Sequence, residues 1–163
     1  MSLRYLPEHA EACVQSLQLA VREASHLSYS RRTLFAQPMD LSWVEKLAER
    51  DDLAEKIDAF VSRFARLQDH IGEKLIPRFA SLLGEQPKSL LDALAYAERM
   101  GWIESAEEFV GIRKLRNLLV HEYMSSPDLF LGALLSADHA AQLLLGIVHR
   151  LEQLVRTLGL AEA

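Results

Sequence analysis

The sequence predicts an all-α protein, an up-and-down antiparallel bundle of four long helices with one or two short ones. Three observations lead to this class. Apolar residues recur at intervals of three and four over long stretches, no segment shows the alternation of a strand, and the connections are short. The chain has 163 residues, half of them apolar and a quarter charged. Such a chain can bury a full core as one domain over residues 1–163 without disulfides or a structural metal.

The first helix is predicted over most of residues 3–27, where apolar side chains form one continuous stripe. Cys13 is the only cysteine and reads as a small core residue of this stripe. A single cysteine excludes an intramolecular disulfide and suits a reducing cytoplasm. A polar loop, SYSRRTLFAQP, is predicted to follow over residues 28–38. The capping-box spacing of Ser42 and Glu45 then predicts a short helix.

The longest element is predicted over residues 52–82, with bends at Gly72 and Pro77. A further helix is expected from Pro87 to about Met100, and Gly101 occupies the position of a C-terminal cap. The second capping-box pair, Ser105 and Glu108, predicts the start of a helix that ends near residue 124. The Ser-Pro pair at 126–127 is typical of an N-cap and first turn, so the last helix begins there.

Polar side chains gather on one face of the helix that contains RKLRNLLVHEY, residues 113–123. At about 100° per residue, Ile112, Leu115, Leu118 and Leu119 form an apolar arc that would enter the core. The opposite arc contains Arg113, Lys114, Arg116, Asn117 and His121, with Tyr123 at its border. A histidine can transfer a proton near neutral pH, and an arginine offers donors that match phosphate oxygens. This cluster is chemically suited to cleaving a phosphodiester.

A bland interpretation of the same residues stays open, because a polar helix face is usually just solvated. The Arg-x-x-x-x-His spacing is a weak signal by itself, since Arg4 and His9 share it. The other histidines lack metal-ligand spacing, and neither a Gly-rich phosphate loop nor a Ser-His-Asp arrangement is evident.

The segment RNLLVHEY nevertheless resembles the R-x-x-x-x-H-x-Y signature of the HEPN superfamily, in the HepT-like branch of nucleotidyltransferase substrate-binding proteins. The signature falls on Arg116, His121 and Tyr123, and the frequent asparagine after the arginine is Asn117. The segments RFARLQDHIGEKLIPRFA and SLLDALAYAERMGWI are also similar, so the resemblance covers roughly residues 50–150.

This resemblance implies a metal-independent endoribonuclease without a cofactor, the toxin of a toxin–antitoxin pair whose antitoxin is a minimal nucleotidyltransferase (MNT). His121 would move the proton and Arg116 would stabilise the phosphate charge, with Asn117 and Arg113 supporting them. The partner would AMPylate Tyr123 and so block the site. Proteins of this kind are homodimers through the signature helix, and we expect a cytoplasmic protein without a membrane span, because no apolar stretch approaches about 20 residues.

Two alternatives remain at this point: a binding subunit of a nucleotidyltransferase without catalytic activity, and a purely structural adaptor. The net charge of −5 argues against a broad surface for phosphates. A local basic rim is therefore hypothesised beside the site, formed by Arg31, Arg32, Arg113 and Lys114.

Overall fold

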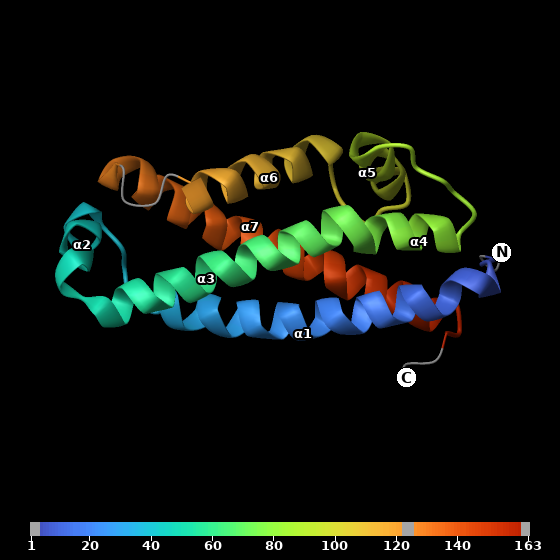
Figure 1. Cartoon of the computed structure of the whole chain (residues 1–163), viewed down its shortest axis with the longest axis horizontal. Coiled ribbons are helices and arrows are strands. Elements are labelled where there is room, and N and C mark those ends of the chain that lie inside the picture. The colour runs from blue at the N-terminus through green and yellow to red at the C-terminus, as the bar shows by residue number, and fades with distance from the viewer. Residues whose placement is uncertain (1–3, 122–125, 161–163) are drawn as a thin grey trace.

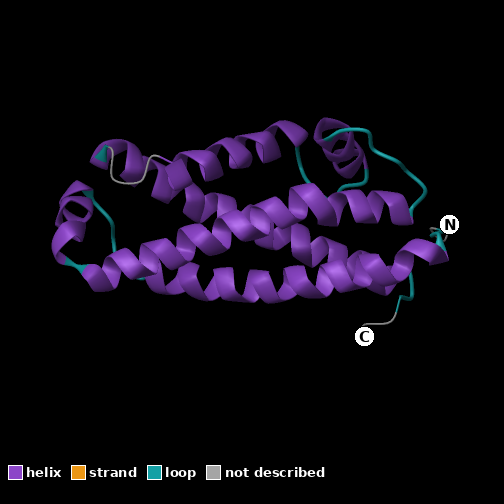
Figure 2. Cartoon of the chain, in the orientation of Figure 1, coloured by secondary structure: helices purple, strands orange, loops and turns teal. Residues whose placement is uncertain are grey.

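The structure, a computed structural model, describes residues 4–121 and 126–160, and within these ranges it contains helices and no strand (Figures 1 and 2). The all-α class is confirmed. In chain order the elements are η1 (Pro7–His9), α1 (Ala10–Leu34), α2 (Leu41–Glu45), η2 (Lys46–Glu49), α3 (Asp51–His70), η3 (Ile71–Leu75), α4 (Ile76–Leu82), α5 (Leu90–Arg99), α6 (Ala106–His121) and α7 (Pro127–Thr157).

Four long rods form the bundle: α1, α3 with its continuation α4, α6, and α7. They lie along one axis and alternate in direction, so the predicted up-and-down arrangement is confirmed (Figure 1). Each rod packs against the next along the chain, and α7 closes the ring by packing on α1. The short helices α2 and α5 lie at opposite ends of the bundle. Because α6 packs on both α3 and α7, one of its faces is fixed in the core.

The helix α7 supplies a large share of the core, and most of its buried side chains are Ala, Leu, Ile or Val. Its length of 31 residues and the mean hydropathy of 1.5 over its most apolar 18-residue stretch are also those of a helix that could cross a membrane. The expectation that no segment is long and apolar enough therefore does not hold for α7. In this fold 44% of that stretch is buried, so packing against α1, α2 and α6 already accounts for much of its composition.

The first helix corrects the prediction at both ends. It is preceded by η1, begins at Ala10 and continues to Leu34, so the predicted loop over residues 28–38 is wrong for Arg31 and Arg32. The polar residues there are satisfied by neighbouring helices: Arg63 Nη1 donates to Ser30 Oγ (2.7 Å), and Arg31 Nε pairs with Asp138 (2.7 Å). Polar composition thus suggested a loop where the structure has interhelical contacts.

Cys13 is fully buried on α1, as predicted. Burial raises the pKa of its thiol to about 12. The thiol is therefore protonated near neutral pH and behaves as a small apolar side chain.

The predicted bend in the longest element is confirmed as η3, a π-helical turn between α3 and α4 that contains Gly72. A Cβ added to Gly72 would lie 3.2 Å from Phe109 Cε1 and 3.5 Å from Arg113 Nη1. Gly72 therefore permits α6 to approach η3 closely. Pro77 is in the first turn of α4, where its missing N–H is tolerated.

The predicted helix caps are confirmed in part. Gly101 has φ +76°, as a C-terminal cap requires, and Ser105 Oγ accepts from Glu108 N (3.1 Å) at the start of α6. Ser126 is the N-cap of α7. The Ser42 prediction is wrong, because the carboxylate of Asp40 accepts from Trp43 N (2.8 Å) and caps α2 instead.

Candidate functional site

The apolar arc of α6 determines which way its polar residues point. Ile112 and Leu119 are buried, and Leu115 and Leu118 pack against the core from partly buried positions. The predicted core-facing arc is thus confirmed. Arg116, on the adjacent face, is directed toward α3.

Arg116 forms a two-point ion pair with Asp69 of α3. Its Nε donates to Asp69 Oδ1 (3.1 Å) and its Nη2 to Asp69 Oδ2 (2.7 Å). A third bond runs from Nη1 to Asn117 Oδ1 (3.3 Å). The two side chains of the ion pair are 25% and 33% exposed, so the pair is accessible from solvent. The guanidinium is therefore held in one orientation and remains reachable.

An open groove of about 600 Å³ lies between α3 and α6 beside this ion pair. We call it the α3–α6 groove. It is lined by Asp58, Val61, Ser62, Ala65, Arg66, Asp69, Arg116, Leu119 and Val120. His121 directly follows Val120 as the last residue of α6. The side chain of His121 and the whole of Tyr123 lie outside the described residues, so their predicted place in the site stays a prediction.

The structure does not bring the four residues of the hypothesised basic rim together in this groove. Arg31 is paired with Asp138 on α7. Arg113 lines a separate hollow of about 290 Å³ together with Gly72, Glu73 and Lys88. Its Nη1 is buried and has no hydrogen-bond partner among the described residues. Arg32 and Lys114 are exposed and line neither cavity.

A second polar cluster, the His70 network, lies on the other side of α3. His70 Nδ1 donates to Glu23 Oε1 (2.5 Å), and His70 Nε2 is hydrogen-bonded to Ser16 Oγ (2.9 Å). This is the connectivity of a Ser-His-acid triad, which the sequence did not reveal because the residues are 47 and 54 positions apart. Ser16 is only 2% exposed, so no substrate reaches its hydroxyl and the network joins α1 to α3.

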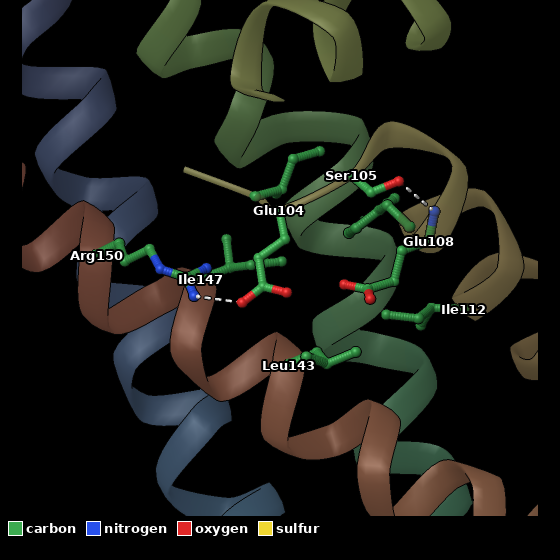
Figure 3. A pocket seen from close by; sticks show the side chains of 9 residues that line it. Glu104, Ser105, Glu108, Ile112, Leu143, Ile147 and Arg150 are labelled. Carbon is green, nitrogen blue, oxygen red and sulfur yellow. Dashed lines mark hydrogen bonds and ion pairs between the residues drawn. The ribbon is translucent and has the colours of Figure 1, made fainter. Parts of the chain in front are cut away.

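A small cavity at the start of α6 carries little chemistry (Figure 3). Its volume of about 10 Å³ leaves room for about one water molecule. Two of its lining residues, Arg150 and Glu104, form an ion pair (3.7 Å), and apolar side chains from α6 and α7 also line it. We therefore place the candidate site in the α3–α6 groove.

Asp69 belongs to the candidate site through its ion pair with Arg116, and no sequence motif pointed to it. The available signal was a run of three consecutive polar residues, Gln68, Asp69 and His70, which interrupts the apolar stripe of an amphipathic helix. Each takes a different environment: Gln68 is fully buried, Asp69 contacts α6 and His70 contacts α1. In the described part of the chain, no group of three or more His, Cys, Asp or Glu side chains is arranged to hold a metal ion.

Comparison with known proteins does not identify the chain. No protein-family model matches it, and neither a curated protein nor a solved structure matches it. The resemblance of RNLLVHEY to the HEPN signature therefore rests on the sequence, and of this segment the structure places Arg116, Leu119 and Val120 in the lining of the α3–α6 groove.

Proposed function

We propose that this protein is a metal-independent endoribonuclease toxin of the HEPN type, controlled by an MNT partner. The observation that carries the proposal is the oriented guanidinium of Arg116 at an accessible groove that runs toward the end of α6, where His121 lies. The proposed substrate is RNA rather than DNA, because the proposed reaction uses the ribose 2′-hydroxyl as its nucleophile.

The hydrogen bonds of Arg116 leave it able to contact a phosphate. A guanidinium has five N–H bonds, and Asp69 and Asn117 engage three of them. Within the described residues, one N–H on each of Nη1 and Nη2 has no hydrogen-bond partner. These two donors can bind phosphate oxygens and stabilise the charge that develops on them during cleavage.

In the proposed reaction His121 accepts the proton of the 2′-hydroxyl or donates one to the leaving 5′ oxygen. The 2′ oxygen attacks the phosphorus, the bond to the 5′ oxygen breaks, and a cyclic phosphate forms. Asn117 keeps Arg116 in place through its amide oxygen. These roles for His121 and Asn117 follow from the family resemblance together with the position of α6.

We propose a homodimer in which two copies of α6 approach each other and complete the site. Several apolar side chains near the end of α6 and the start of α7 are solvent-exposed in the single chain: Val120 (41%), Leu129 (61%) and Leu135 (48%). Covering such side chains with a second copy would bury apolar area. AMPylation of Tyr123 by the partner would add a negative group near Arg116 and exclude RNA by charge and volume.

The second candidate function is a binding subunit that holds a nucleotide or substrate for a nucleotidyltransferase without cleaving it. One observation favours it: the carboxylate of Asp69 offsets the charge of Arg116, which weakens transition-state stabilisation but still allows phosphate binding. The two functions differ in whether the isolated protein cuts RNA.

The deciding experiment compares the wild type with His121→Ala, each purified and also expressed without a partner. The nuclease proposal expects growth arrest and RNA cleavage in EDTA from the wild type and neither from His121→Ala. His139→Ala, an exposed histidine on α7, is the matched control and should behave as the wild type. If the wild type and His121→Ala are both folded and dimeric but neither arrests growth nor cleaves RNA, the binding-subunit function is favoured instead.

The modification of Tyr123 is tested separately by co-expression with the MNT partner. Intact-mass measurement should then reveal an added AMP that Tyr123→Phe lacks, together with loss of RNA cleavage in the modified wild type. Cleavage by the wild type that the partner never inhibits would argue against this form of control.

A further inference from the structure

A second open groove lies on the other side of α3. This α1–α3 groove has a volume of about 530 Å³ and is lined by Leu19, Arg22, Glu23, His26, Arg66, Asp69, His70, Glu73 and Lys74. Arg66 and Asp69 line it and also the α3–α6 groove. The two grooves therefore meet at the ridge of α3, which Figure 1 shows between α1 and α6 on the near side of the molecule.

The cations along this joined surface are largely uncommitted. Arg22, Arg66 and Lys74 are all exposed. Among the described residues neither Arg22 nor Lys74 has an ion-pair partner, and the hydrogen bond of Arg66 to Ser62 Oγ is long (3.5 Å). An unpaired surface cation can contact a phosphate without first losing a carboxylate partner.

The carboxylates of the α1–α3 groove are mostly engaged elsewhere. Asp69 is paired with Arg116, and Glu23 is paired with His70 beneath the surface. Glu73 is the remaining acidic side chain of the lining, and the other histidine there is His26. The uncommitted charge of the groove is thus positive, although the chain as a whole has a net charge of −5.

We infer that a single strand of RNA cut in the α3–α6 groove continues across α3 into the α1–α3 groove, where Arg66, Arg22 and Lys74 bind its phosphates. This inference rests on the proposed nuclease function and names the substrate path of the same site. The lining residues of α3 and η3 run from Asp58 to Lys74, about 24 Å along a helix axis. At about 3.4 Å per stacked nucleotide that length accommodates several nucleotides.

The path also resolves a difficulty at Arg116. Because Asp69 offsets the charge of Arg116, this arginine can orient a phosphate through its hydrogen-bond donors but adds no net positive charge to the RNA-binding surface. Affinity for the polymer must then come from cations that lack a carboxylate partner, and Arg22, Arg66 and Lys74 meet that condition. The His70 network below them ties α1 to α3, so the floor of the second groove is held in place.

The test measures binding of labelled single-stranded RNA of about ten nucleotides at several salt concentrations. Every protein carries His121→Ala so that the RNA stays intact. The test variant adds Arg22→Ala and Lys74→Ala. The control adds Arg32→Ala and Lys114→Ala, which remove the same charge from exposed positions outside both grooves. All four side chains are exposed and without ion pairs in the described structure, so melting temperatures should match.

We expect the test variant to bind several-fold more weakly, with the slope of log K against log salt concentration smaller by about 1.4, or about 0.7 for each lost phosphate contact. The control should keep the slope of the parent. In the cleavage-competent protein the same pair of changes should raise KM and leave kcat unchanged. A dinucleotide, too short to cross α3, should be cut equally well by both.

Two different failures are distinguishable. If the wild type cuts RNA but the test and control variants show equal affinity and equal slope, the path over α3 is wrong and the nuclease function stands. If the control loses affinity instead, RNA crosses α6 on the side of Lys114. If no protein in the series binds or cuts RNA, the proposed function itself fails and the path falls with it.

Discussion

The two sides of α3 use similar chemistry for different ends. Toward α6, Asp69 holds Arg116 at a groove where both side chains keep a quarter or more of their surface exposed. Toward α1, the neighbouring His70 is hydrogen-bonded to Glu23 and Ser16, and the side chains of His70 and Glu23 are only 7% and 10% exposed. Burial decides the difference: an accessible pair can exchange a partner for a ligand, whereas a buried pair can only stabilise or destabilise the fold.

The largest expected effect is on RNA cleavage, from a substitution on the α6 side of α3 that should leave the stability of the fold nearly unchanged. Arg116→Ala should lower kcat for RNA cleavage by about 10² to 10³, because the donors that face the phosphate are lost. The free energy of unfolding should change by less than about 1 kcal/mol, since the ion pair with Asp69 is partly exposed. Cleavage assays and urea denaturation measure the two effects. Unchanged cleavage would remove Arg116 from the site, and Arg32→Ala is the control.

The opposite result is expected on the α1 side. His70→Ala should lower the free energy of unfolding by about 3 kcal/mol, because it leaves the carboxylate of Glu23 buried without its partner. His26→Ala, an exposed histidine nearby, should change it by less than about 0.5 kcal/mol. Replacing both His70 and Glu23 by leucine should recover most of the loss. A loss below about 1 kcal/mol for His70→Ala would show that the network contributes little.

The close approach of α6 to η3 is tested by Gly72→Ala. The added Cβ would lie 3.2 Å from the ring of Phe109, which is itself 1% exposed and tightly enclosed. We expect a destabilisation of about 1–2 kcal/mol from overpacking, measured by thermal unfolding. Gly132→Ala on α7 is the matched control: nothing lies within 4 Å of its added Cβ, and it should stabilise the helix by about 0.5–1 kcal/mol. Equal behaviour of the two would contradict the packing argument.

The smallest effect concerns Gln68, the polar residue that directly precedes Asp69 and His70 on α3. Gln68 is fully buried, and neither its Oε1 nor its Nε2 has a hydrogen-bond partner among the described residues. Gln68→Met keeps the length of the side chain and removes the unpaired groups, so we expect a gain of about 1 kcal/mol in unfolding free energy. The exposed Gln153→Met should be neutral. Destabilisation by Gln68→Met would indicate that the amide groups are bound in solution.

The sequence predicted most of the architecture because apolar periodicity is a local property of each helix. It gave the four long rods, the cap at Gly101, the break near Gly72 and the buried arc of α6. It failed at residues 28–34, where Arg31 and Ser30 are satisfied by partners on α7 and α3. No local pattern distinguishes such polar residues from those of a loop.

The sequence predicted only the part of the candidate site that lies on a single helix, α6. The spacing of Arg116 and Asn117 placed them together, and the structure joins them by a hydrogen bond. Asp69 was missed because its partner is 47 positions away, and the basic rim was misplaced for the same reason. Which side of α6 faces a neighbour depends on packing between helices, and the polar face by itself does not encode it.

The π-helical turn has a consequence for the register of the whole rod. The buried residues Leu67, Ile71, Leu75 and Phe79 are each four positions apart and fully enclosed. In an uninterrupted α-helix each such step overshoots a full turn by about 40°, so three steps would rotate the stripe about 120° out of the core. The wider turn at Ile71–Leu75 absorbs this excess and returns α4 to the correct phase. Removing one residue from it would place Phe79 eleven positions after Leu67, and eleven steps of about 100° end only about 20° past three full turns. We therefore expect this deletion to restore a regular α-helix with Phe79 and Leu82 still facing the core, so the wider turn of η3 is what accommodates one extra residue without rotating the two halves of the rod relative to each other.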